Sequence, residues 1–209
     1  MRIREMLVAL GVVIAGVLVG FFVTQFMNRT PPPVIASATS NTVEGRPVVD
    51  VQLTTVGAVG SGPHPNWVAY LNSDGQPTTF IHAPAGSVVR MTIDQQDSAT
   101  GLRNPYFALV RGTLNNEMTI NGKATTSIAP DTSAHTFTIP DLGVSVPLLG
   151  VPSNAPTNAQ EVVQFEFVAP TRKGLYRWQC FVPCGAGTLY GNGGPMQTLG
   201  YMAGELQVT

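Results

Sequence analysis

Charged residues are scarce in this chain of 209 residues. Asp, Glu, Lys and Arg make up 11% of it, whereas an average soluble domain contains ~25%. Eleven basic residues stand against 12 acidic ones, so the net charge is -1 and no basic surplus is present to neutralise phosphates. We therefore exclude a nucleic-acid-binding protein, and this composition also argues against a coiled coil, a helical bundle or an acidic disordered tail.

Cysteine and histidine are also rare, with two Cys and three His in the chain. The sequence lacks the G-x-S-x-G and H-E-x-x-H motifs and has no glycine-rich phosphate loop after a strand. Residues 191–195 (GNGGP) are glycine-rich, but no helix follows them. We interpret this stretch as a flexible insertion. The two cysteines leave either a disulfide or a metal site open.

Turn-forming residues, in contrast, are abundant, with 22 Gly and 17 Pro. Between them lie short alternating or apolar stretches that are typical of strands, at residues 48–54, 67–71, 78–82, 87–94, 135–139, 162–168, 174–179 and 204–209. No amphipathic helix of useful length is evident after residue 30, and residues 143–160, with three prolines, are expected to form a long loop. The pattern predicts an all-β sandwich or barrel with Greek-key connections.

One long apolar run stands apart from this pattern, at residues 6–27, which carry no charge. At ~1.5 Å per residue it can cross a hydrocarbon core of ~30 Å. Arg2 and Arg4 precede it, which favours a cytoplasmic N-terminus and a domain on the outer face. A cleaved signal peptide is the alternative, because residues 36–38 read A-S-A, but the run exceeds the ~7–15 apolar residues of a signal peptide.

These features divide the chain into three expected parts. Residues 1–29 form a membrane anchor, residues 30–46 a tether rich in Pro, Ser and Thr, and residues 47–209 the folded domain. A Pro-rich tether is partly extended and holds the domain away from the membrane.

Three segments contain the residues with metal-binding chemistry. Residues 134–143 (AHTFTIPDLG) contain His135, residues 174–185 (GLYRWQCFVPCG) contain Cys180 and Cys184, and residues 202–208 (MAGELQV) begin with Met202. In this order, and together with residues 85–92, they resemble the cupredoxin family. The resemblance is closest to the CuA-type soluble domain of cytochrome c oxidase subunit II, with its G-x-Y-x-x-Q-C-x-x-x-C-G and M-x-G-x-[LI]-x-V motifs, and it spans about residues 78–209.

The resemblance implies an all-β, cupredoxin-like Greek-key β-sandwich preceded by a single N-terminal transmembrane helix. It also implies copper as the cofactor, with His135, Cys180, Val182 (through its main-chain carbonyl), Cys184 and Met202 as metal ligands. Thiolate, imidazole and thioether donors are the ligands that copper electron-transfer sites use. No catalytic residue is expected.

One ligand of the family pattern is missing. The family has a second His four residues after the second Cys and three before the Met, where this chain has Thr188 and Leu199, and no His follows His135. A mononuclear or altered CuA-type copper site, or loss of the metal, is therefore expected. Met196, His64 and His82 are the residues that could replace the missing imidazole.

The resemblance implies a membrane-anchored, extracytoplasmic protein that acts as, or like, subunit II of a haem-copper terminal oxidase. It would transfer electrons in a respiratory chain, from a soluble donor to a membrane oxidase complex, without being catalytic alone. Two alternatives stay open. One is a structural or assembly subunit whose copper-free domain carries a Cys180–Cys184 disulfide, and the other is a copper delivery protein.

Overall fold

The computed structural model describes residues 3–23, 37–78, 80–101, 104–185 and 193–209. The chain divides into two units, Met1–Thr30 and Pro31–Thr209. The first unit contains helix α1 (Ile3–Phe22), none of whose residues is buried. By length and composition α1 can cross a membrane, so the expected N-terminal apolar helix is present and could serve as a membrane anchor. The end of the predicted apolar run, residues 24–27, lies outside the described residues.

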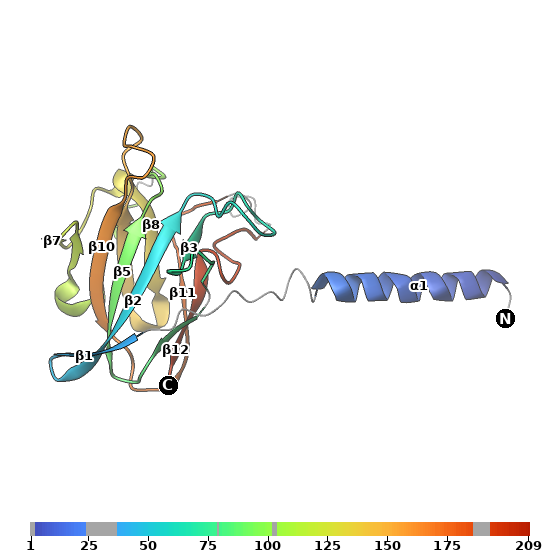
Figure 1. The fold of residues 1–209 in the computed structure, drawn as a ribbon, viewed down its shortest axis with the longest axis horizontal. Coiled ribbons are helices and arrows are strands. Elements are labelled where there is room, and N and C mark those ends of the chain that lie inside the picture. The colour runs from blue at the N-terminus through green and yellow to red at the C-terminus, as the bar shows by residue number, and fades with distance from the viewer. Residues whose placement is uncertain (1–2, 24–36, 79, 102–103, 186–192) are drawn as a thin grey trace. The chain divides into compact units, whose positions relative to one another are not determined.

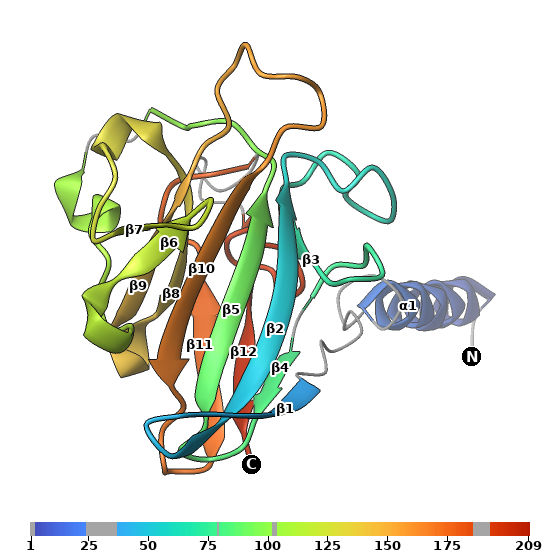
Figure 2. The same cartoon turned by 60° about the vertical axis from the view of Figure 1, so that its left-hand side comes forward.

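The second unit consists of two β-sheets that lie face to face (Figures 1 and 2). In the first sheet, β3 (Ala69–Leu71) pairs with β2, and the other described strands follow the order β1 (Ser37–Val43), β2 (Arg46–Val56), β5 (Val88–Gln95), β10 (Glu161–Val168), β6 (Met118–Ile120) and β7 (Lys123–Thr125). The second sheet has the order β4 (Phe80–Ala83), β12 (Ala203–Val208), β11 (Gly174–Gln179), β8 (Ser133–Ile139) and β9 (Val144–Leu149). The β2–β5 and β4–β12 pairs are parallel.

Short 3-10 helices connect some of these strands: η2 (Pro105–Ala108), η3 (Leu114–Asn116), η4 (Pro130–Thr132) and η5 (Pro140–Leu142). Between β1 and β12 the described residues contain no α-helix. The predicted all-β sandwich is therefore confirmed, and each of the eight stretches expected to be strands overlaps one.

Alternating side chains from both sheets form the core. In β5, Val89, Met91 and Ile93 are buried between the sheets, while the residues between them are only half-buried. Phe137 of β8 stacks against Trp178 of β11 with ring centroids 5.5 Å apart. These buried aromatic rings join the second sheet to the apolar face of the first.

We expect Phe137→Ala to destabilise the domain by ~3–5 kcal/mol, because the truncation leaves a cavity among buried rings. Phe137 is fully buried, whereas Leu175 of β11 is 57% exposed. Leu175→Ala is therefore the matched control and should change the free energy of unfolding by no more than ~0.5 kcal/mol. Urea unfolding of both variants measures the difference. Equal effects would contradict the packing described here.

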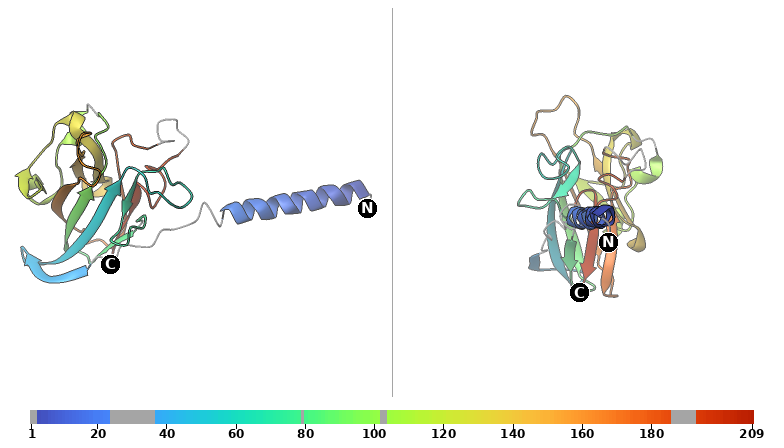
Figure 3. Two further views of the ribbon diagram at one scale, coloured as in Figure 1. Left: turned by 45° about the horizontal axis from the view of Figure 1, so that its top comes forward. Right: turned by 90° about the vertical axis from the view of Figure 1, so that its right-hand side faces the viewer.

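Two expectations about irregular segments differ from the structure. Residues 143–160 were expected to form a loop, but β9 occupies Val144–Leu149, with Pro147 opposite Thr136 of β8. Proline is tolerated there because β9 is the last strand of its sheet, and the isolated bridge on its outer side pairs Arg111 with Ser145 rather than with Pro147. The first sheet also begins earlier than residue 47. Strand β1 lies within the segment expected to be a tether and forms a hairpin with β2 (Figure 3).

Candidate metal centre

The predicted ligands lie at one end of the sandwich, on a strand or on the connection between two strands. Gln179 ends β11 and pairs with Ala203 at the start of β12, so the connection that carries both cysteines lies at this end. The opposite ends of the two strands pair Gly174 with Val208, beside the C-terminus. Gln179 also pairs with Thr138 of the antiparallel strand β8. This pairing brings the beginning of β8, with His135, to the same end as the cysteines.

Three of the predicted ligands form a tight group. The Sγ atoms of Cys180 and Cys184 are 3.6 Å apart, and Cys180 Sγ is 3.9 Å from His135 Nδ1. One ligand atom from each of the three residues lies within 4.8 Å of the other two. All three side chains are buried. Both cysteines are free, and their sulfurs are well beyond the ~2.05 Å of a disulfide bond.

Backbone contacts hold Cys180 in this position. Its N–H donates to the carbonyl of Met202 at 2.9 Å, and the N–H of Thr136 lies 3.5 Å from its Sγ. The carbonyl oxygen of Val182 is 3.3 Å from the same sulfur. The main-chain carbonyl that the resemblance implied as a ligand is thus beside the sulfur of Cys180, and Val182 itself is fully buried.

Asp97 is a site residue that the sequence analysis missed. Its Oδ2 lies 3.0 Å from Nε2 of His135, the ring nitrogen on the side away from Cys180. Asp97 follows β5 of the first sheet, whereas His135 belongs to the second sheet. A Cβ atom at Gly57 would come within 2.8 Å of Asp97 Oδ1, so this approach needs the small residue. No sequence motif links residues so far apart, and the contact exists only because the sheets stack.

The charges within the group are strongly coupled. Burial alone would lower the pKa of His135, but its contacts with Asp97 and Cys180 outweigh this effect and raise the pKa to about 9. Burial would raise the pKa of Cys180, but hydrogen bonds with Cys184 and His135 lower it well below its ordinary value. The pKa of Cys184 is raised, first because its thiol donates to Cys180 and second because it is buried. In the absence of metal, these contacts favour the charged form of His135, the thiolate form of Cys180 and the neutral form of Cys184.

The two methionines near the site are held differently. Met202 is fully buried, and its carbonyl accepts from Cys180 N–H, so its backbone belongs to the site. Met196 approaches through its side chain, with Sδ 3.3 Å from the N–H of Cys184. Thr188, at one expected position of the missing imidazole, lies outside the described residues. Leu199, at the other, is 37% exposed.

The two remaining histidines do not join the group. Among the His, Cys, Asp and Glu residues that the structure describes, the group that could hold a metal ion consists of His135, Cys180 and Cys184. It does not include His64 or His82. His64 is exposed and stacks on Trp67, with ring centroids 3.7 Å apart. His82 lies on β4, an edge strand of the second sheet. Neither histidine replaces the absent imidazole in this arrangement.

The donor set fits copper. Two thiol groups, an imidazole and the nearby thioether of Met196 are soft or borderline ligands, which suit copper better than hard cations such as magnesium or calcium do. The imidazole presents Nδ1 to the sulfurs while Nε2 is held by a carboxylate, the outer contact that orients metal-binding histidines. The group can therefore hold a metal ion once its ligand atoms have lost their protons.

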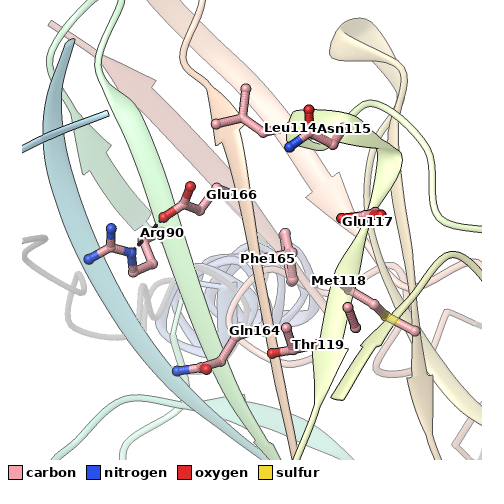
Figure 4. Close-up of a pocket in the computed structure, with 10 residues that line it drawn as sticks. Arg90, Leu114, Asn115, Glu117, Met118, Thr119, Gln164, Phe165 and Glu166 are labelled. Carbon is pink, nitrogen blue, oxygen red and sulfur yellow. Dashed lines mark hydrogen bonds and ion pairs between the residues drawn. The ribbon is translucent and has the colours of Figure 1, made fainter. Parts of the chain in front are cut away.

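A hollow on another part of the sandwich lacks thiol and imidazole donors (Figure 4). It has a volume of about 270 Å³ and is lined by β5, β6, β7 and β10 together with η3. Its arginine, Arg90, is already paired with Glu166 at 2.6 Å and with Asp50 at 3.5 Å. The lining contains no Cys or His, so the metal-binding chemistry of the described residues is concentrated at the cysteine end.

No protein-family model matches the chain, and no curated protein matches its sequence. Among solved structures it is similar to a chain of a haem-copper terminal oxidase dimer, with 14% identity and a TM-score of 0.36 over 100% of both chains. It is similar to rusticyanin, with 15% identity and a TM-score of 0.37 over 84% of this chain and 87% of that one. It is also similar to the copper-containing nitrite reductase NirK from Thermus scotoductus SA-01, with 12% identity and a TM-score of 0.36 over 77% of this chain and 30% of the reductase. Similarity at this level assigns no function to the chain.

Proposed function

We propose that the domain is an electron-transfer module that holds copper through His135, Cys180 and Cys184. The observation that carries this proposal is the buried group itself, whose three ligand atoms lie within 4.8 Å of one another. Copper, when bound, supplies one-electron chemistry. The protein's part is to hold soft donors on a rigid support, which limits rearrangement when the charge of the site changes.

Each site residue has a separate part in this proposal. Cys180 and Cys184 provide thiolates and His135 provides Nδ1, while the Val182 carbonyl and Met202 complete the proposed ligand set. Asp97 holds the far side of the imidazole at 3.0 Å. The closed packing around the group, in which Cys180 and His135 are fully buried, excludes water and other metal-binding molecules.

We further propose that the module acts at a membrane, as or like subunit II of a haem-copper terminal oxidase. Helix α1 can serve as a single-pass anchor, and Arg2 and Arg4 before it favour a cytoplasmic N-terminus. The β-sandwich is then on the outer face, where it can receive electrons from a soluble donor and pass them to a membrane oxidase complex. Such a module makes and breaks no substrate bonds by itself.

Burial of the ligands favours electron transfer over copper delivery. A delivery protein must exchange its metal with a partner, which requires accessible ligands, but Cys184, the most exposed of the three, is only 6% exposed. The free cysteines favour a metal site over a structural domain closed by a disulfide. Both alternatives remain as outcomes of the following test.

Copper loading of the full chain, purified from membranes in detergent, tests the proposal. We expect stoichiometric copper and a visible thiolate-to-copper absorption that disappears on reduction and returns on oxidation. The ratio of copper to protein distinguishes a mononuclear from a dinuclear site, and intact mass distinguishes a retained anchor from a cleaved signal peptide. A colourless, copper-free protein with a Cys180–Cys184 disulfide would instead be a structural subunit. Reversible loss of copper to a chelating partner without redox cycling would favour delivery.

A further inference from the structure

The segment before β12 is fastened to the cysteine connection. Pro195 accepts a hydrogen bond through its carbonyl from the N–H of Met202 at 2.9 Å, and a Cβ atom at Gly185 would overlap the Pro195 ring. Two hydrogen bonds span Met196: the Gly194 carbonyl accepts from Gln197 N–H at 3.1 Å and from the Thr198 hydroxyl at 3.0 Å. Met196 is therefore held in a tight turn directly against the residues that carry the thiols.

The side chain of Met196 faces inward from this turn. Its exposed fraction is 9%, and Sδ lies 3.3 Å from the N–H of Cys184, one of the three residues of the metal-binding group. A thioether is a weak hydrogen-bond acceptor, and the unbranched methionine side chain adapts easily. Exchanging this N–H contact for a metal contact therefore costs little. The described group has one imidazole and two sulfur donors from His and Cys, and the thioether of Met196 lies beside one of them, Cys184.

We propose that Met196 Sδ is a ligand of the bound metal and stands in for the imidazole that the chain lacks. The inference rests on the proposed copper site and specifies its donors as sulfur-rich. Such a donor set favours the reduced, softer copper ion over the oxidised one. A thioether then takes the place of the second imidazole, and the chain keeps a copper site without a second histidine.

Three Met→Leu variants of the full chain test the inference, because leucine has a similar volume and no sulfur. We expect Met196→Leu to shift the thiolate-to-copper absorption and to weaken binding of the reduced copper ion by at least ~10-fold, the lower end of effects seen around metal sites. The matched control is Met118→Leu, a buried methionine beside the hollow of Figure 4, which should leave both readouts unchanged. Met202→Leu is compared in parallel.

The outcomes separate this inference from the proposed function. If wild-type protein binds copper but Met196→Leu matches it in spectrum and affinity, the inference is overturned and the copper site stands. The inference is also overturned if Met202→Leu alone alters the spectrum. A wild-type chain that takes up no copper overturns both. Should Met196→Leu fail to fold, copper-edge X-ray absorption of selenomethionine-labelled Met202→Leu protein decides: a copper–selenium contact supports Met196 as a ligand, and its absence contradicts it.

Discussion

Cys180→Ser is expected to abolish the visible absorption of the copper-loaded protein. Its sulfur is the central atom of the group, 3.6 Å from Cys184 Sγ, 3.9 Å from His135 Nδ1 and 3.3 Å from the Val182 carbonyl. A hydroxyl group in this position is a harder and far less acidic donor, so the variant loses the thiolate that makes the site suit copper. Copper affinity should fall by more than ~100-fold, because the loss of an outer contact of a metal site alone costs up to that factor.

Cys184→Ser is the informative comparison for this variant. Cys184 contacts Cys180 but is not the sulfur beside the imidazole. If both thiolates bridge two copper ions, either substitution should remove the dinuclear signature and reduce the stoichiometry. If the site is mononuclear around Cys180, Cys184→Ser should retain a shifted absorption. Circular dichroism is the control for folding, and full copper binding by folded Cys180→Ser protein would refute the assigned site.

Asp97→Asn is expected to weaken copper binding ~10–100-fold, the range typical of lost outer contacts to a metal-binding histidine. The carboxylate lies 3.0 Å from His135 Nε2 and contributes to the raised pKa of the imidazole, where it opposes the effect of burial. A neutral amide keeps the shape of the side chain but removes the charge, so His135 becomes a weaker electron donor. The reduced copper ion should then be favoured, and the reduction potential should rise.

Asp94→Asn provides the matched control, since it makes the same chemical change three residues away, within β5. Asp94 accepts a hydrogen bond from Gln52 at 2.8 Å rather than from a member of the metal-binding group. Its substitution should leave the copper affinity and potential at wild-type values. Titration of both variants against a copper chelator, followed by redox titration, measures the difference. Equal behaviour of the two variants would show that the carboxylate of Asp97 does not act on the site.

Sequence patterns located most of the strands because their physical basis is local. Alternation in residues 87–94 and 162–168 reflects the two faces of a strand, and these stretches correspond to β5 and β10. Strand β9 was missed because Pro147 argues against a strand unless it lies at a sheet edge, and edge position is a property of the whole sheet. Strand β1 was missed because its sequence, SATSNTV, shows no apolar alternation.

Three of the predicted ligands, His135, Cys180 and Cys184, were identifiable as a set from the sequence because their motifs occur in the order of the resembling family. The structure adds the distances between them, which depend on the pairing of β8 with β11. Met196 was one of several alternatives in the sequence. Its selection depends on the turn at residues 194–197 and on the contact of Pro195 with Gly185.

The amino-acid sequence by itself determined the apolar helix, the all-β character of the domain and the residue types available for metal binding. These properties depend on composition and on periods of a few residues, which the chain displays locally. Only the tertiary structure decided that Asp97, which follows β5 of the first sheet, contacts His135 of the second sheet and that Met196 faces Cys184. Such contacts join residues from separate elements, and they arise from the stacking of two sheets and the path of a loop rather than from any local pattern.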